Sequence, residues 1–180
     1  MAKTRKKKNS RLIFWVQLVI AIILIGTISG GLLQVGGGDR GSSAAPDFPP
    51  WIAGLKIMDY KSGEDAKGRM NTLSEETTAL RDAWIGYYEQ NAVVWIGQAT
   101  SESEADRLVK AMRKKTQDAI STTPELTFQE SNKKGLSVNV IKVREQESEY
   151  FYQKRDKVFW VTLPPGKEEP FINEVVERLN

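Results

Sequence analysis

The 180-residue sequence contains neither cysteine nor histidine. Without cysteine, the chain offers no disulfide, thiolate zinc site, iron–sulfur cluster or cysteine nucleophile. Without histidine, it lacks the commonest general base, the commonest metal ligand, the usual triad partner of a serine and the axial ligand of many haem proteins. These absences favour a non-enzymatic protein, for which we expect no cofactor and no bound metal.

Basic residues are scarce outside the first eleven positions. The chain has 26 lysines and arginines against 23 aspartates and glutamates, a formal net charge of +3. Six of the 26 lie before position 12, so residues 12–180 carry 20 basic and 23 acidic side chains. The pI of about 9.0 is therefore a local property, and we expect no nucleic-acid partner. The six basic residues are Lys3, Arg5, Lys6, Lys7, Lys8 and Arg11.

Charge is absent altogether between Leu12 and Gly38, and the first half of this stretch is strongly apolar. About 20 helical residues cross a hydrocarbon core of about 30 Å. The sequence therefore predicts a single transmembrane helix over residues 12–34, with Trp15 near the cytoplasmic interface. The alternative is a cleaved signal peptide, although no clear small-x-small cleavage site directly follows the apolar run.

The flanking charge predicts the orientation of this span. Lysine and arginine are retained on the cytoplasmic side, so we expect residues 1–11 to be a cytoplasmic tail and the carboxyl-terminal part to be extracytoplasmic, at the cell membrane. Gly26 and Gly30 form a G-x-x-x-G pair, which lets two membrane helices approach closely. A flexible exit from the bilayer is the alternative interpretation. The expected partners are the lipid bilayer and an integral membrane protein or complex.

Glycine, serine and proline dominate the next segment, residues 35–50, which predicts a linker. Residues 51–180 then form the predicted extracytoplasmic domain. Ser101 and Glu104 match a capping box, and the apolar stripe after them predicts a helix to Ile120. Strand and helix signals along the domain give the order β-α-β-β-α-β-β-β-β-α.

Two segments of the domain share a pattern. Residues 87–96 and 150–161 each read as an aromatic strand ending in glutamine, a short polar turn and a strand V-[VF]-W-[IV]. A predicted helix follows each of them. This pattern favours an internally duplicated α+β domain, an antiparallel sheet with helices packed on one face, by analogy with ferredoxin-like folds. Chance similarity of two hairpins is the alternative.

Aromatic residues gather in these two hairpins. We expect Trp95 and Trp160 to be paired core residues under the two helices, because bulky aromatic side chains usually supply core area. Tyr88 and Tyr152 stand next to the polar residues Glu89 and Gln153, so they are the candidate partner surface.

Candidate chemistry is sparse. Ser131 and Lys134 match S-x-x-K, a motif of serine acyl enzymes, but they fall in a polar turn and not at the start of a buried helix. A hydrolase is therefore the least favoured function. The favoured function is a non-enzymatic, single-pass, membrane-anchored accessory or assembly subunit. An anchored extracytoplasmic module that binds an unknown ligand is the alternative.

Overall fold

A computed structural model describes residues 48–74, 80–143 and 147–179, which all belong to one compact unit. The basic tail, the predicted span with Trp15, Gly26 and Gly30, and most of the predicted linker lie outside the described residues. Within the described ranges, no helix has both the length and the apolar character needed to cross a membrane.

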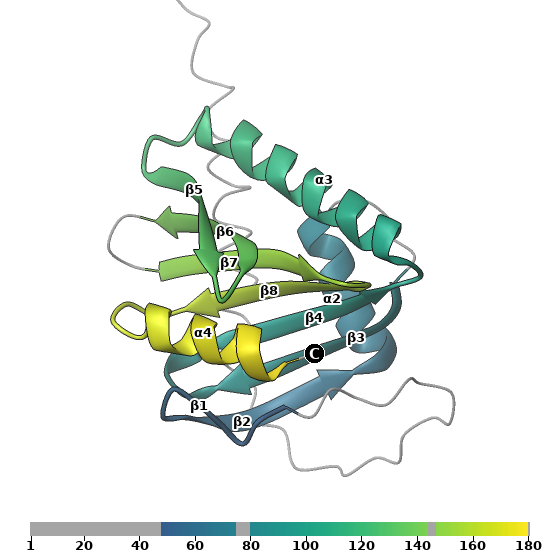
Figure 1. The fold of residues 1–180 in the computed structure, drawn as a ribbon, viewed down its shortest axis with the longest axis vertical. Coiled ribbons are helices and arrows are strands. Elements are labelled where there is room, and N and C mark those ends of the chain that lie inside the picture. Colours follow the sequence, from purple (N-terminus) through teal and green to yellow (C-terminus); the bar gives the residue numbers. More distant parts are fainter. Residues whose placement is uncertain (1–47, 75–79, 144–146, 180) are drawn as a thin grey trace, which may run out of the picture. The chain divides into compact units, whose positions relative to one another are not determined.

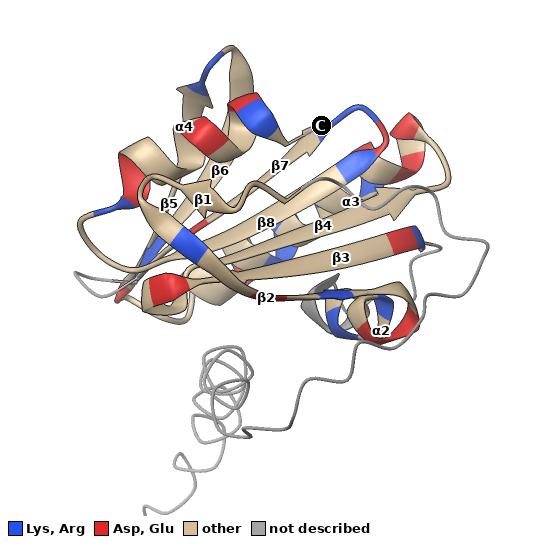
Figure 2. Cartoon of the chain, turned by 90° about the horizontal axis from the view of Figure 1, so that it is seen from below, with Lys and Arg blue, Asp and Glu red and all other residues tan. Residues whose placement is uncertain are grey.

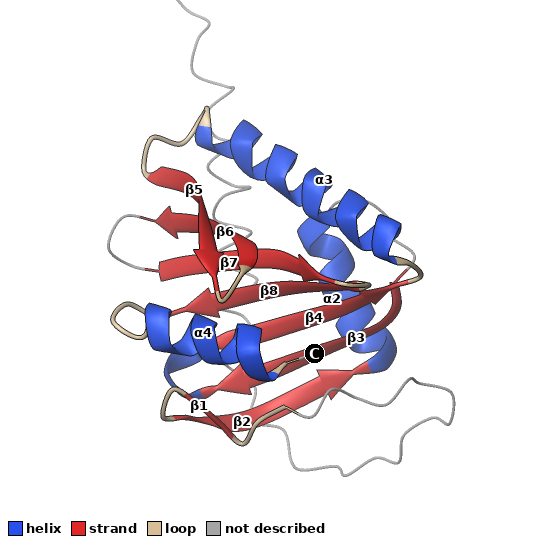
Figure 3. Cartoon of the chain, viewed as in Figure 1, coloured by secondary structure: helices blue, strands red, loops and turns tan. Residues whose placement is uncertain are grey.

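The described residues form one antiparallel sheet with three helices (Figures 1 and 3), which confirms the α+β class. The strand order across the sheet is β1-β2-β3-β4-β8-β7-β6-β5. The predicted order of strands and helices along the chain is confirmed, and the structure adds the two-residue strand β1. The strands are β1 (Trp51–Ile52), β2 (Leu55–Ser62), β3 (Leu80–Tyr88), β4 (Val93–Ala99), β5 (Leu126–Lys133), β6 (Leu136–Val143), β7 (Glu147–Lys154) and β8 (Lys157–Leu163). The helices are α2 (Gly63–Ser74), α3 (Glu102–Ile120) and α4 (Glu168–Arg178).

Helix α3 begins after the serine of the capping pattern. The Ser101 hydroxyl accepts a hydrogen bond from the Glu104 N–H at 3.2 Å, which satisfies one of the unpaired donors of the first turn. The Glu104 carboxylate accepts a hydrogen bond from the Arg107 side chain at 3.0 Å. The buried side chains of α3 then form the predicted apolar stripe, namely Ala105, Leu108, Val109, Met112 and Thr116.

The helices cover both faces of the sheet, so the prediction that they share one face was wrong. Helices α2 and α3 pack in a cluster with Trp95 and Trp160, whereas α4 packs in a second cluster with Trp84 and Tyr152. Figure 2 shows α4 and α2 on opposite sides of the strands. The physical reason lies in the central strands. Every residue of β4 is buried, so its side chains are shielded from solvent on both faces of the sheet, which requires helices on both faces. We call these the α3 face and the α4 face.

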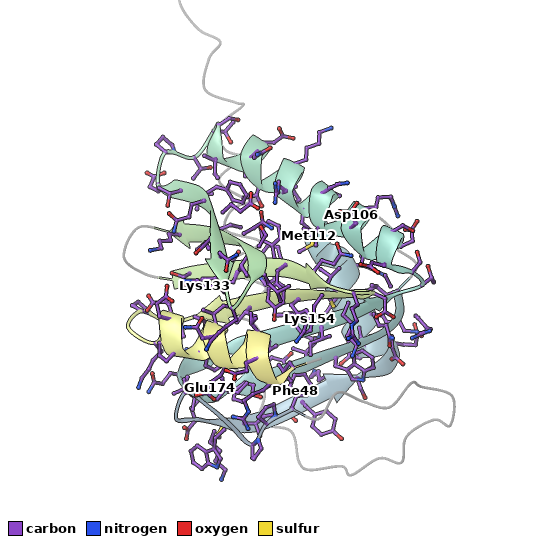
Figure 4. The ribbon with its side chains drawn as sticks, in the orientation of Figure 1. Phe48, Asp106, Met112, Lys133, Lys154 and Glu174 are labelled. Atoms are coloured by element: carbon purple, nitrogen blue, oxygen red, sulfur yellow. The ribbon has the colours of Figure 1, made fainter. Side chains whose placement is uncertain are left out.

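Polar contacts to three strands attach α4 to the sheet. The Lys154 ammonium donates to the carbonyls of Val176 and Leu179, both at 3.0 Å, at the carboxyl-terminal end of the helix (Figure 4). Burial, with the nearby charges of Arg155 and Lys157, lowers the pKa of Lys154. Lys133 pairs with Glu169 at the other end of the helix, and Arg178 donates to the Trp51 carbonyl at 2.9 Å. The last helix is thus held to β1, β5 and β7.

Trp95 and Trp160 are directly opposite each other on the central pair β4 and β8, and both are buried, as predicted for core residues. Both lie on the α3 face, so α4 does not cover Trp160, contrary to the prediction. Trp160 instead stacks on Phe151, with ring centroids 5.3 Å apart.

The pairing register gives an alignment of the two hairpins that differs from the one the sequence pattern suggests. Trp95 lies opposite Ile85 and Trp160 lies opposite Phe151, so these two positions are equivalent, not Tyr87 and Tyr150. The offset arises because the turns differ in length: a 3-10 turn over Glu89–Asn91 joins β3 and β4, whereas two residues join β7 and β8.

Candidate functional site

The structure places both candidate partner-surface residues in the core, so that prediction was wrong. Tyr88 is 3% exposed, its ring meets Phe171 of α4 edge-on at 5.5 Å, and its hydroxyl donates to the Pro49 carbonyl. Tyr152 is fully buried and stacks on Phe159 with ring centroids 4.7 Å apart. Burial raises the pKa of both phenols. Neither side chain is available to a partner, because strand alternation turns both toward α4.

Ser131 and Lys134 do not form a catalytic pair. Ser131 lies within β5, opposite Val138, where the sequence predicted a turn. Lys134 follows the strand at a φ of +52°, and its ammonium lies 3.8 Å from the Glu177 carboxylate. Residues three apart along an extended strand are separated by about 10 Å and point to opposite faces, so a serine–lysine dyad needs a different backbone.

Exposed apolar side chains mark a different place. Among the described residues, the large hydrophobic side chains that stand in solvent are Trp51, Met58 and Tyr60, which are 51%, 66% and 60% exposed. All three belong to β1 and β2, at one edge of the sheet. We call this group the β1–β2 edge. Scattered exposed apolar residues are normal, but three at one edge of the sheet form a candidate contact surface.

The backbone of this edge is also available. Strand β1 pairs only with Leu55 and Lys56, and the Pro50 carbonyl accepts from the Ile57 N–H at 3.0 Å. From Met58 to Ser62, β2 has no strand partner on its outer side within the described part of the chain. The Tyr60 N–H donates to the Asp59 carboxylate at 2.8 Å, so it is directed away from β3. An unpaired strand edge of this kind is a template for a further strand.

In the open part of β2, Tyr60 stands between the charged residues Asp59 and Lys61. Tyr60 lies opposite Gly86, on the α4 face, whereas Asp59 and Lys61 lie opposite Tyr87 and Ile85, on the α3 face. Lys61 lies 3.4 Å from Asp65 of α2. Figure 2 shows charge of both signs on β2, beside central strands that carry almost none.

The opposite edge of the sheet, formed by β5, is polar. Strand β5 exposes polar side chains only: Thr127, Gln129, Glu130 and Asn132. Ion pairs connect it to the helices on both sides, since Glu130 lies 3.5 Å from Arg113 of α3, and Lys133 pairs with Glu169 of α4 (Figure 4). Of the two edges, the β1–β2 edge is therefore the one suited to a partner.

Acidic side chains of the described residues form ion pairs and do not gather into a site. Within the part of the chain that the structure describes, no three acidic side chains come together as a metal site. Asp65 bridges Lys61 and Arg69, and Glu64 pairs with Lys67 at 2.8 Å, so the acids at the start of α2 neutralise nearby cations.

Comparison with known proteins identifies no family: the chain matches no model of a known family, and no curated protein is significantly similar to it. A functional assignment must therefore rest on the β1–β2 edge and on the predicted membrane span.

Proposed function

We propose that this chain is a non-enzymatic, single-pass membrane-anchored accessory or assembly subunit, whose extracytoplasmic α+β domain docks an integral membrane partner through the β1–β2 edge. One observation carries the proposal: three large apolar side chains, Trp51, Met58 and Tyr60, are more than half exposed at one edge of the sheet, where β2 has no outer strand partner from Met58 to Ser62 within the described residues. Tryptophan, tyrosine and methionine are among the residue types enriched at protein interfaces.

The position of the edge along the chain supports a partner in the same membrane. Strand β1 begins at Trp51, directly after the segment 35–50 that the sequence assigns to the linker. Sixteen extended residues span at most roughly 55 Å, so the edge stays within that distance of the predicted span. A partner embedded in the same bilayer is therefore within reach without any further tether.

We also infer that the domain arose by internal duplication. Two pairings support this: β4 and β8 pair with the two tryptophans at opposite positions in register, and each is paired on its other side with the preceding strand of its own hairpin. The helices do not follow the repeat, because α3 and α4 lie on opposite faces. On this proposal, the hairpins are the duplicated units and the helix positions diverged.

The test is purification of the full-length chain from membranes in a mild detergent. We expect an assembly larger than the monomer, and we expect the double variant Met58→Glu, Tyr60→Glu to release it, because two charges replace exposed apolar contacts. The matched control is Thr127→Glu, Gln129→Glu on the β5 edge, which should leave the assembly intact. A monodisperse monomer for the unaltered chain would overturn the proposal.

A second candidate is the ligand-binding module, favoured by two buried donors on the α4 face. The Trp84 indole N–H and the Tyr152 hydroxyl are buried and have no hydrogen-bond partner among the residues that the structure describes. A buried donor without an acceptor is costly, and a ligand that supplied an acceptor would remove that cost. A thermal-shift screen of the full-length chain with small extracytoplasmic metabolites and glycans tests this candidate, because a bound ligand stabilises by mass action. The absence of any stabilisation would count against it.

A further inference from the structure

We propose that the occupant of the β1–β2 edge is a second copy of this chain, and that the two β2 strands pair antiparallel around a two-fold axis at Tyr60. The inference rests on the proposed function, since it names the partner of the same edge. A two-fold contact of this type is isologous, so each copy uses the same residues.

The backbone at the centre of the open stretch has the geometry that this contact needs. The Tyr60 N–H points outward, away from β3, where it donates to the Asp59 carboxylate. When two antiparallel strands meet at such a residue, the two opposed residues exchange both N–H···O=C bonds. The Tyr60 carbonyl of the second copy then replaces the Asp59 carboxylate as the acceptor, and the carboxylate becomes free for another contact.

The charges of β2 select this register over its neighbours. With Tyr60 at the axis, Asp59 of each copy lies opposite Lys61 of the other, which gives two opposite-charge pairs. An axis at Asp59 would oppose the two aspartates, and an axis at Lys61 would oppose the two lysines. Opposite charges directly across an antiparallel pair stabilise it, and like charges destabilise it. The sequence around Tyr60 is therefore complementary to itself in one of these three registers.

The side chains on the other face add to the contact. In this register the two Tyr60 rings, 60% exposed in one copy, lie opposite each other on the α4 face. Cross-strand aromatic pairs are among the stabilising pairs of antiparallel sheets. Met58 and Ser62 flank the axis at the two ends of the open stretch.

Pairing through β2 also removes the exposed edge of the sheet. The joined sheet would run from β5 of one copy to β5 of the other, and β5 exposes polar side chains that are tied to α3 and α4 by ion pairs. Both outer edges of the dimer would then carry the polar and charged residues that oppose further strand addition. The assembly would stop at two copies.

A charge exchange tests the register in the full-length chain, with its mass measured in detergent. Asp59→Lys opposes lysines and Lys61→Asp opposes aspartates, so we expect each to weaken the dimer about tenfold or more. The double variant Asp59→Lys, Lys61→Asp restores opposite charges and should recover the dimer. Gly26→Leu, Gly30→Leu is the control for contact between the predicted spans, and it should leave the dimer intact.

The absence of cysteine allows a second test. Opposed residues of a hydrogen-bonded antiparallel pair have Cα atoms about 5.5 Å apart, within the range that a disulfide bridges. Tyr60→Cys should therefore give a covalent dimer on oxidation, and the control Gln129→Cys on the β5 edge should not.

Three outcomes would overturn the inference. A chain that binds a different protein at this edge and shows no cross-linking through Tyr60→Cys would refute self-pairing and leave the proposed function standing, whereas a monomer without any partner would refute both. A dimer that resists Asp59→Lys and Lys61→Asp but dissociates with Gly26→Leu, Gly30→Leu would assign the contact to the span.

Discussion

The Tyr88 hydroxyl donates a 3.0 Å hydrogen bond to the carbonyl of Pro49, 39 residues earlier in the chain. Next to this bond, the Phe48 ring lies over Gly86, where an added Cβ would come within 2.8 Å of the ring. Residues 48–50 were predicted as the end of the linker, yet Pro49 is buried and Phe48 packs against the α4-face cluster. The packed domain therefore includes at least Phe48 and Pro49, ahead of the predicted start at Trp51.

Residues 48–180 should fold without the preceding segment. Both core clusters are built from strands and helices inside this range, and α4 returns to β1 through the Arg178 bond to Trp51. We expect a cooperative unfolding transition in urea and a dispersed amide NMR spectrum. A fragment starting at Trp51 should be less stable, since it loses Phe48 and the Pro49 carbonyl. A non-cooperative transition for residues 48–180 would contradict the expectation.

Tyr88→Phe should destabilise this fragment. The substitution removes the donor and leaves the Pro49 carbonyl without this bond, which costs about 1–2 kcal/mol. Urea unfolding measures the loss. An unchanged midpoint would show that the carbonyl finds another donor.

Tyr152→Phe should act in the opposite direction. The Tyr152 hydroxyl is buried and has no hydrogen-bond partner in the described part of the chain, so its removal relieves a desolvation cost and leaves the stacking on Phe159 in place. We expect the free energy of unfolding to rise by about 1 kcal/mol. The pair Tyr88→Phe and Tyr152→Phe makes the same chemical change at two buried sites of the α4 face, with opposite expected signs. Destabilisation by Tyr152→Phe would mean that the hydroxyl has an acceptor.

The domain should lose stability above about pH 10. Burial, with minor contributions from Glu168 and Glu169, raises the pKa of Tyr150 to about 12, despite a hydrogen bond from Ser148 that lowers it. Below pH 10 the phenol is protonated in both states. Between pH 10 and 12 the unfolded chain ionises and the folded chain does not, so the free energy of unfolding falls as pH rises. Tyr150→Phe should make this decline shallower in urea titrations at pH 9, 10, 11 and 12, and an identical slope would refute the assignment.

Most of the secondary structure could be predicted from local signals. Ser101 and the apolar stripe after it define α3, and alternation defines the strands. The side of the sheet that each helix covers could not be predicted from the repeat, because equivalent hairpins lead to helices on opposite faces. The unbroken apolar run from Val93 to Ile96 was the available signal, since a strand without polar alternation is buried on both faces.

The candidate surface was misplaced for a related reason. The polar sequence neighbours of Tyr88 and Tyr152 favour exposed positions for both, but adjacent residues of a strand point to opposite faces. Because every second residue of a strand points to the same face, Tyr88 lies on the face of the buried Trp84, four residues earlier. The β1–β2 edge was missed because the place of a strand within a sheet depends on tertiary pairing. The one local hint was the charge of Lys56, Asp59 and Lys61 within one strand, which is typical of edges.

The strand order has a consequence for how the domain folds. Every adjacent pair of strands in the sheet is consecutive in the chain, with the single exception of β4 and β8. The first four strands and the last four can therefore each form through contacts of modest sequence separation, and only the seam between Trp95 and Trp160 requires a long loop to close. We expect docking of the two halves along this seam to limit the folding rate, so that the tryptophan pair reports the last step by fluorescence.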